Sequence, residues 1–113
     1  MAQVRTKATD SNSLLQWGAA TKALKGQTES GDRYLVKPVN VGYLVAVVDG
    51  LGHGDEAALA AEKAISTIDA YANESVMTIL RRCHDHMRTT RGAVGSLVLF
   101  DGRDESIMWL GVG

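Results

Sequence analysis

The sequence has little of several residue types that would point to a particular class of protein. Its 113 residues include one cysteine and one proline, and no run of roughly 18 consecutive apolar residues occurs. The lone thiol, Cys83, cannot form an internal disulfide or share a metal with a second cysteine, and residues 1–12 are polar. These absences argue against a disulfide scaffold, a zinc–thiolate site, a secretory signal and a membrane span. We therefore expect a cytoplasmic protein without membrane contact.

An excess of charge of one sign is also missing. The 12 basic and 13 acidic residues leave a formal net charge of −1, with both signs interspersed along the chain. Long-range attraction to nucleic acid needs a broad basic surface, which this composition does not provide. We expect residues 1–113 to form a single domain that recognises its partners locally, because there is no repeat or linker. The oligomeric state is left open.

Hydrophobic periodicity predicts the element order β-β-β-α-α-β-β. Strands are expected at 14–24, 32–39, 43–48, 93–100 and 106–110. Between them we expect a helix over 55–72 and a second helix with an apolar stripe of Val76, Ile79, Leu80, Cys83 and Met87. Strand runs around a helix pair indicate an α+β fold with a largely antiparallel sheet. Pro38 places its strand toward an edge, whereas residues 43–48 are apolar on both faces and need cover on both sides.

Two acidic residues are expected to meet at one end of this sheet. Asp49 follows the doubly apolar strand, and Asp32 opens the strand before it. The short step at residues 40–42 predicts an antiparallel hairpin, in which the start of one strand lies beside the end of the next. Three glycines that would let backbone carbonyls approach an ion follow closely: Gly50, Gly52 and Gly54. The segment therefore predicts a divalent-cation site.

Each of these features also has another interpretation. Asp32 can simply complete a turn and Asp49 can cap a helix, and a histidine among glycines such as His53 is more often solvated than catalytic. Residues 52–57 fit the G-x-G-x-x-A pattern of a dinucleotide loop, but a second helix follows where a Rossmann unit needs a parallel strand. Cys83 is expected to be inert core. A basic cluster is expected to be a solvated face: Arg81, Arg82, Arg88 and Arg91.

Four short segments then occur in a recognisable order: Ser30-Gly-Asp32, Val48-Asp-Gly-Leu-Gly-His-Gly54, Arg91-Gly-Ala-Val-Gly-Ser96 and Gly111-Val-Gly113. In this order they resemble the PP2C-like (SpoIIE-type) protein serine/threonine phosphatases. Arg82-Cys83 and Met87 make the RsbX-type stressosome phosphatases the nearest subgroup. The resemblance implies an αββα sandwich of largely antiparallel sheets flanked by helices. Because residues 109–113 stop in or just after an apolar strand, we expect this chain to be the N-terminal part only, C-terminally incomplete.

The resemblance also implies an activity, which is metal-dependent hydrolysis of phosphoserine or phosphothreonine on phosphorylated stressosome proteins with STAS domains. Asp32 and Asp49 would be the catalytic residues, and with the carbonyl of Gly50 they would hold two Mn²⁺ or Mg²⁺ ions that activate a shared water. The family's further metal-binding aspartates fall beyond Gly113. Two alternatives stay open: a non-catalytic phosphoprotein-binding module of the same fold, and a nucleotide-binding protein.

Overall fold

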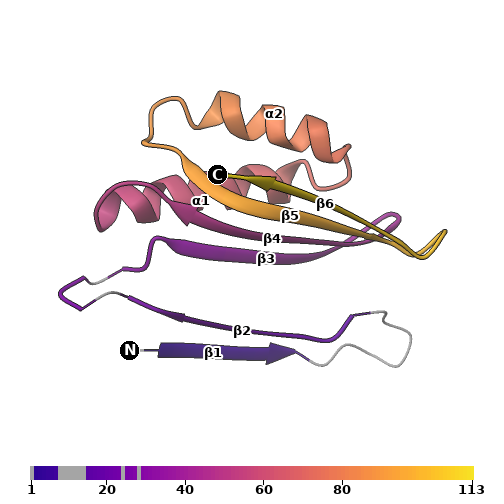
Figure 1. Cartoon of the computed structure of the whole chain (residues 1–113), viewed down its shortest axis with the longest axis horizontal. Helices are drawn as coiled ribbons and strands as arrows, with labels where there is room; N and C mark the ends of the chain where they lie inside the picture. The colour runs from indigo at the N-terminus through magenta and orange to yellow at the C-terminus, as the bar shows by residue number, and fades with distance from the viewer. Residues whose placement is uncertain (1, 8–14, 24, 28) are drawn as a thin grey trace.

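A computed structural model describes residues 2–7, 15–23, 25–27 and 29–113. Its elements are β1 (Ala2–Lys7), β2 (Trp17–Lys22), β3 (Asp32–Val39), β4 (Gly42–Gly50), α1 (Asp55–Ala70), α2 (Val76–His86), β5 (Ala93–Asp101) and β6 (Ser106–Val112). Strands β3 to β6 form a four-stranded antiparallel sheet in sequence order, and β1 pairs with β2 in a separate two-stranded sheet. Figure 1 shows the two helices on one side of the larger sheet and the β1–β2 pair on the other.

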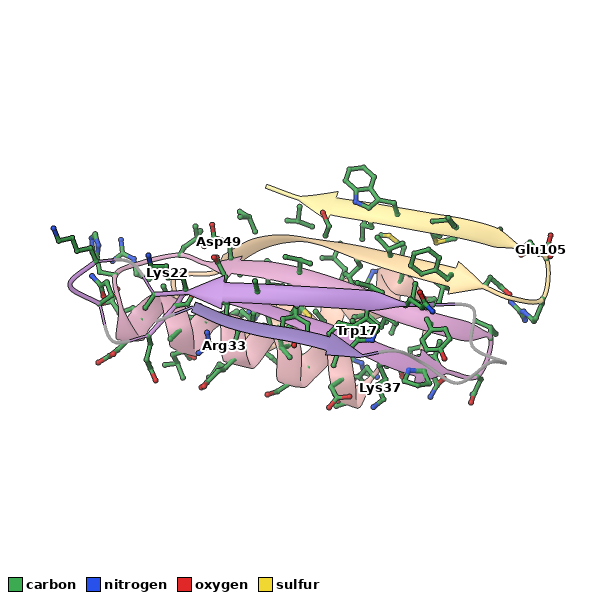
Figure 2. All side chains as sticks on the ribbon, turned by 90° about the horizontal axis from the view of Figure 1, so that it is seen from below. Trp17, Lys22, Arg33, Lys37, Asp49 and Glu105 are labelled. Carbon is green, nitrogen blue, oxygen red and sulfur yellow. The ribbon has the colours of Figure 1, made fainter. Side chains whose placement is uncertain are left out.

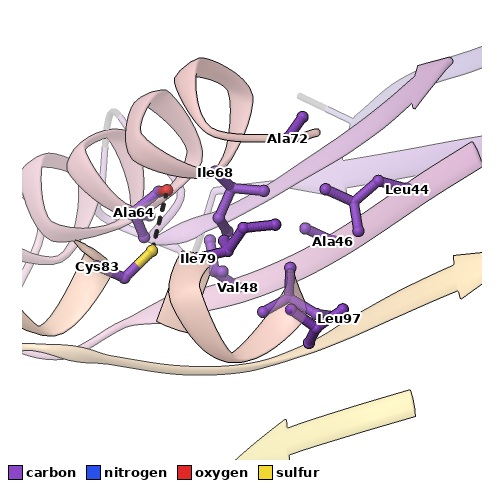
Figure 3. Close-up of a cluster of buried hydrophobic side chains, with 11 residues drawn as sticks. Leu44, Ala46, Val48, Ala64, Ile68, Ala72, Ile79, Cys83 and Leu97 are labelled. Carbon is purple, nitrogen blue, oxygen red and sulfur yellow. Dashed lines mark hydrogen bonds between the residues drawn. The ribbon is translucent and has the colours of Figure 1, made fainter. Parts of the chain in front are cut away.

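Strand β4 is central in the sheet and alternates in burial because its two faces have different neighbours. Leu44, Ala46 and Val48 are buried on the face that meets the helices. Val47 and Asp49 lie on the other face of the strand and are exposed. Side chains of α1 and the apolar stripe of α2 close the core over this face: Ala61, Ala64, Ile68, Val76, Ile79 and Cys83. Figure 3 shows Ala64, Ile68, Ile79 and Cys83 over Leu44, Ala46 and Val48. The alanines let α1 lie close to the sheet.

The two helices begin in different ways. Ser75 caps α2, since its hydroxyl oxygen accepts a hydrogen bond from the Thr78 N–H at 3.2 Å. Helix α1 has no side-chain cap and starts directly after the glycine-rich loop at Gly54. Its first turn carries Asp55 and Glu56, whose negative charges suit the positive end of a helix dipole. The loop that follows Asp49 is therefore held between a central strand and a helix start.

Most predicted elements are confirmed, and Pro38 does lie on an edge strand. The strand expected at 14–24 is observed as Trp17–Lys22, with residues 14 and 24 outside the described part of the chain. Strand β1 was missed because its sequence reads as polar. No helix in the described ranges is long and apolar enough to span a membrane.

The predicted αββα sandwich is wrong for this chain. The described residues form a small α+β structure in which both helices cover the same face of one four-stranded sheet. The other face meets a sheet of two strands, with no helix layer beyond it among the residues described. Local periodicity predicted the individual elements correctly, but it carries no information on how many layers cover a sheet.

Candidate functional site

The hairpin of β3 and β4 brings the two predicted acids together. Asp32 and Asp49 are direct partners in the register of the two strands, at the end where β3 begins and β4 ends. Side chains of directly opposed residues share one face of the sheet, with Cβ atoms about 4.5–5.5 Å apart. Both carboxylates are exposed, and Figure 2 shows Asp49 at the end of the sheet opposite Glu105. The predicted convergence of the two acids is confirmed.

Backbone contacts hold this end of the hairpin in place. The Ser30 hydroxyl oxygen accepts a hydrogen bond from the Asp32 N–H at 3.0 Å, and the Gly31 carbonyl accepts one from the Gly50 N–H at 2.8 Å. The guanidinium of Arg33 donates to the backbone carbonyls of Ser30 and Asp32. The backbone that carries the two acids is therefore fixed before any ligand binds.

The two carboxylates themselves are unpaired within the described part of the chain. Neither Asp32 nor Asp49 makes a hydrogen bond or ion pair through its side chain with another described residue. Like charges directly opposite on neighbouring strands repel each other. A bound cation would remove this repulsion, and carboxylate oxygens are ligands that Mg²⁺ and Mn²⁺ accept.

The glycine-rich loop lies directly beside the acids. Gly52 and Gly54 have φ angles of 112° and 47°, a region that favours glycine. Leu51 ties the loop to the start of β5, since its N–H donates to the Gly92 carbonyl at 2.9 Å. The predicted third ligand is the carbonyl of Gly50, whose oxygen lies 3.4 Å from the position that a Cβ on Gly31 would take. Among the described residues, no group of three or more Asp, Glu, His or Cys side chains could hold a metal.

The acids of the β5–β6 turn cannot complete this site. Asp101, Asp104 and Glu105 belong to the β5–β6 turn, at the opposite end of the sheet. Arg103 donates two side-chain hydrogen bonds to Asp101, and these bonds hold the pKa of that carboxyl below its usual value. The predicted site therefore consists of Asp32, Asp49 and backbone oxygens.

The structure confirms that the basic cluster is a solvated face. Arg82 lies 3.6 Å from Glu74 and stacks over Tyr71, and two further exposed ion pairs join Arg88 to Asp85 and Arg91 to Glu56. The dinucleotide-loop interpretation of residues 52–57 fails, because β4 and β5 are antiparallel where a Rossmann unit needs parallel strands. His53 is exposed.

The sequence interpretation missed a groove whose lining includes one of the two acids, Asp32. A cavity of about 830 Å³ lies between β2 and β3, and Trp17, Thr21, Asp32 and Tyr34 are among the residues that line it. The Trp17 and Tyr34 rings meet edge to face, with centroids 5.6 Å apart. The hydroxyl oxygen of Thr21, which lines this groove, is buried and has no hydrogen-bond partner in the described ranges. No local sequence signal could reveal it, because the groove depends on how β2 and β3, which do not pair with each other, stack in two different sheets.

Cys83 is buried on the core side of α2, as predicted. Its thiol lies 3.8 Å from the Ala64 carbonyl (Figure 3), and burial raises its pKa from the ordinary 9.0 to about 11. A thiolate is therefore disfavoured in the folded state at neutral pH, which agrees with an inert core residue.

This pKa shift predicts a pH dependence of stability. The raised folded-state pKa means that the neutral thiol favours folding fully below about pH 9, and that this contribution, on the order of 2 kcal/mol, is lost as the pH rises from 9 toward 11. We expect Cys83→Ala to remove that part of the fall in the free energy of unfolding at high pH. Urea unfolding of both proteins at about pH 8 and about pH 11 tests this, and equal declines in the two proteins would contradict it.

Comparison with known proteins places this small α+β domain beside proteins of bacterial stress signalling. No protein-family profile matches the chain. The phosphoserine phosphatase RsbX of Bacillus subtilis (strain 168) is 29% identical over 89 residues, which are 79% of this chain and 45% of RsbX. A solved structure described as "The bacterial stressosome: a modular system that has been adapted to control secondary messenger signaling" is 35% identical with a TM-score of 0.74, covering 99% of this chain and 50% of that chain.

A crystal structure of RsbX in complex with magnesium gives a TM-score of 0.73 at 24% identity, over 99% of this chain and 49% of that chain. This identity is low enough that the match supports a common fold alone. The chain thus spans about half the length of the relatives it matches.

These matches correct the identification drawn from the sequence. The chain is not the PP2C-like phosphatase domain that the motifs suggested, since it superposes over 99% of its length on a stressosome-related structure and is a smaller α+β unit than that fold. The prediction that the chain is an enzyme is also wrong. The chain corresponds to 45% of the phosphatase RsbX, and a stressosome-related structure matches 99% of it. What the matches do support is a relation to bacterial stress signalling, through the similarity of the chain to RsbX and to a stressosome-related structure.

Proposed function

We propose that this chain is a non-catalytic binding module of bacterial stress signalling, which docks a phosphorylated partner protein through a divalent cation. The observation that carries the proposal is the pairing of Asp32 with Asp49 in the β3–β4 register, with both carboxylates exposed and without a described partner. The similarity to RsbX and to a stressosome-related structure supports the stress-signalling context.

The cation would be Mn²⁺ or Mg²⁺, held by the carboxylates of Asp32 and Asp49 and by the carbonyl of Gly50. Both ions prefer oxygen ligands in a roughly octahedral arrangement, so three protein ligands leave positions for water or for phosphate oxygens. A site with so few charged ligands retains metal weakly by itself. A phosphoryl group that adds its own oxygens would strengthen the complex, which couples binding of the cation to binding of the partner.

The groove between β2 and β3 would receive the partner's backbone beside its phosphorylated residue. Its lining includes Asp32, one of the proposed ligands of the cation. The unpartnered Thr21 hydroxyl is a suitable hydrogen-bond partner for a peptide group there, since a buried polar atom without a partner is unfavourable. The partner class that fits the stress-signalling relatives is a stressosome protein with a STAS domain that carries phosphoserine or phosphothreonine.

Titration with a phosphoserine peptide from such a protein tests the proposal. We expect binding in the presence of Mn²⁺, at least about tenfold weaker binding with a chelator or with the unphosphorylated peptide, and no release of inorganic phosphate. Equal binding of both peptides would contradict phosphate docking. Steady release of phosphate by the purified chain would contradict a non-catalytic role.

A single variant separates the groove from the cation site. Thr21→Val removes the unpartnered hydroxyl at nearly constant shape, and we expect it to weaken peptide binding about fivefold while Mn²⁺ binding stays unchanged. Thr89→Val is a matched control, because Thr89 is an exposed threonine outside the groove. Unchanged peptide affinity in Thr21→Val would remove the groove from the proposal while leaving the cation site standing.

A further inference from the structure

Arg91 differs in its position from the other three arginines of the basic cluster. Those three lie on α2 or directly after it, whereas Arg91 is in the segment that leads into β5 at Ala93. Figure 1 shows the end of β4, the start of α1 and the start of β5 at the same end of the four-stranded sheet. The chain therefore brings a positively charged side chain to the end of the sheet where the paired acids lie.

Backbone contacts fix the segment of Arg91 beside the glycine-rich loop. The ladder between β4 and β5 ends with the pair of Gly50 and Ala93. Beyond that pair, the Leu51 N–H donates a hydrogen bond to the Gly92 carbonyl at 2.9 Å. Arg91 is the residue directly before Gly92. Its backbone is therefore held next to the loop that follows β4.

The side chain of Arg91 lies over this loop at Gly52. A Cβ added to Gly52 would come within 3.1 Å of the Arg91 Cδ and 2.9 Å of the Glu56 Oε2. The Arg91 Nε is 3.8 Å from that same Glu56 oxygen, and the two side chains are 68% and 59% exposed. The bare backbone of Gly52 thus gives the arginine side chain room to lie only three residues along the chain from Asp49.

The guanidinium of Arg91 is available to a ligand. It makes no hydrogen bond with another residue in the described ranges, and its ion pair with Glu56 is long and exposed, a kind of pair that contributes little. Arg33 is different, because its guanidinium already donates to the backbone carbonyls of Ser30 and Asp32. Of these two arginines, Arg91 is therefore the one that can turn toward an anion at little cost.

The charge of the proposed docking site favours an arginine beside it. Two carboxylates and one divalent cation sum to no net charge, and a phosphoryl group on the partner then adds about −1.5 to −2 at pH 7. A planar guanidinium matches the oxygens of a phosphoryl group with two parallel N–H donors. An unphosphorylated side chain at the same place offers no such pair of acceptors.

We propose that Arg91 recognises the phosphoryl group of the docked partner, with its guanidinium donating to the phosphoryl oxygens of phosphoserine or phosphothreonine. This inference rests on the proposed function, and it adds the residue that separates a phosphorylated partner from an unphosphorylated one. On docking, Arg91 exchanges its loose contact with Glu56 for the phosphoryl group, while Asp32 and Asp49 hold the cation.

Titration of Arg91→Gln with the phosphoserine peptide in the presence of Mn²⁺ tests this role. We expect binding about tenfold weaker than that of the wild type, because charge-assisted hydrogen bonds to the phosphoryl group are lost. The affinities for the unphosphorylated peptide and for Mn²⁺ alone should stay unchanged. Arg88→Gln is the matched control, since Arg88 is likewise exposed (71%) and paired with one acid, Asp85, and it is expected to bind as the wild type does.

Arg91→Lys separates hydrogen bonding from charge. A lysine keeps the positive charge but lacks the planar pair of donors, so we expect it to recover only part of the lost affinity. Full recovery by the lysine would overturn recognition through paired hydrogen bonds, because a point charge would then be enough.

The remaining outcomes distinguish the role of Arg91 from the proposed function. Wild-type affinity of Arg91→Gln for the phosphoserine peptide, an equal loss for both peptides, or the same loss in Arg88→Gln would overturn the role of Arg91 and leave cation-dependent docking standing. A wild-type chain that binds both peptides equally would instead contradict the proposed function, and the role of Arg91 would fall with it.

Discussion

Replacing Gly50 with alanine is expected to unfold the protein or to lower its free energy of unfolding by about 3 kcal/mol or more. A Cβ at Gly50 would lie 1.9 Å from the Ala57 carbonyl oxygen, 2.8 Å from its carbonyl carbon and 3.0 Å from the Ala61 nitrogen. These are backbone atoms of α1, so no side-chain rotation can relieve the clash. The helix would have to move off the end of β4 and lose its contacts with the core.

Urea unfolding followed by circular dichroism measures this effect. Gly26→Ala is a suitable control, since nothing lies within 4 Å of an added Cβ there. Gly26 has a φ of 86°, which an alanine adopts at a cost of about 1–2 kcal/mol. The free energy of unfolding of the control is therefore expected to fall by that amount only. A wild-type unfolding midpoint for Gly50→Ala would contradict the close packing of α1 against β4.

The sequence predicted a special role for Gly50 but gave the wrong reason for it. The pattern of a strand followed by a glycine-rich loop indicated that the backbone there comes close to something, and the sequence interpretation chose an ion. The structure supplies a different and sufficient reason, which is the approach of α1 to the sheet. The carbonyl of Gly50 stays a predicted ligand, but the missing side chain is already explained by packing.

The meeting of Asp32 and Asp49 was predictable because it depends on short-range features. Alternating hydrophobicity locates β3 and β4, and the tight step between them makes the hairpin antiparallel, which sets the register. The groove beside Asp32 was not predictable, because β2 and β3 share no hydrogen-bond ladder and their stacking leaves no periodic signal.

The family resemblance failed for a related reason. Its motifs are short segments around a strand, a loop and a helix start, and the structure has that local arrangement. The size of the whole domain, the number of layers and the presence of catalysis depend on residues far from those motifs. Local likeness therefore predicted the position of Asp49 correctly and the class of protein wrongly.

The second large effect is expected at the paired acids. Asp49→Asn removes one of two charged ligands without changing side-chain size, and we expect it to weaken Mn²⁺ binding by at least about tenfold. The fold should survive, because Asp49 is exposed and makes no side-chain hydrogen bond with a described residue. Asp55→Asn has the same charge change at the nearby start of α1 and is expected to leave the affinity nearly unchanged.

Electron paramagnetic resonance tests the cation site most directly, because the signal of free Mn²⁺ falls as the ion is bound. Titration of the wild-type chain is expected to show one site with a dissociation constant on the order of 10⁻⁴ to 10⁻³ M, the weak range for an exposed site with few carboxylates. Asp49→Asn should lose this binding, and Asp55→Asn should keep it. An undiminished free-ion signal with wild-type protein, or equal binding by Asp49→Asn, would show that the paired carboxylates do not hold a cation.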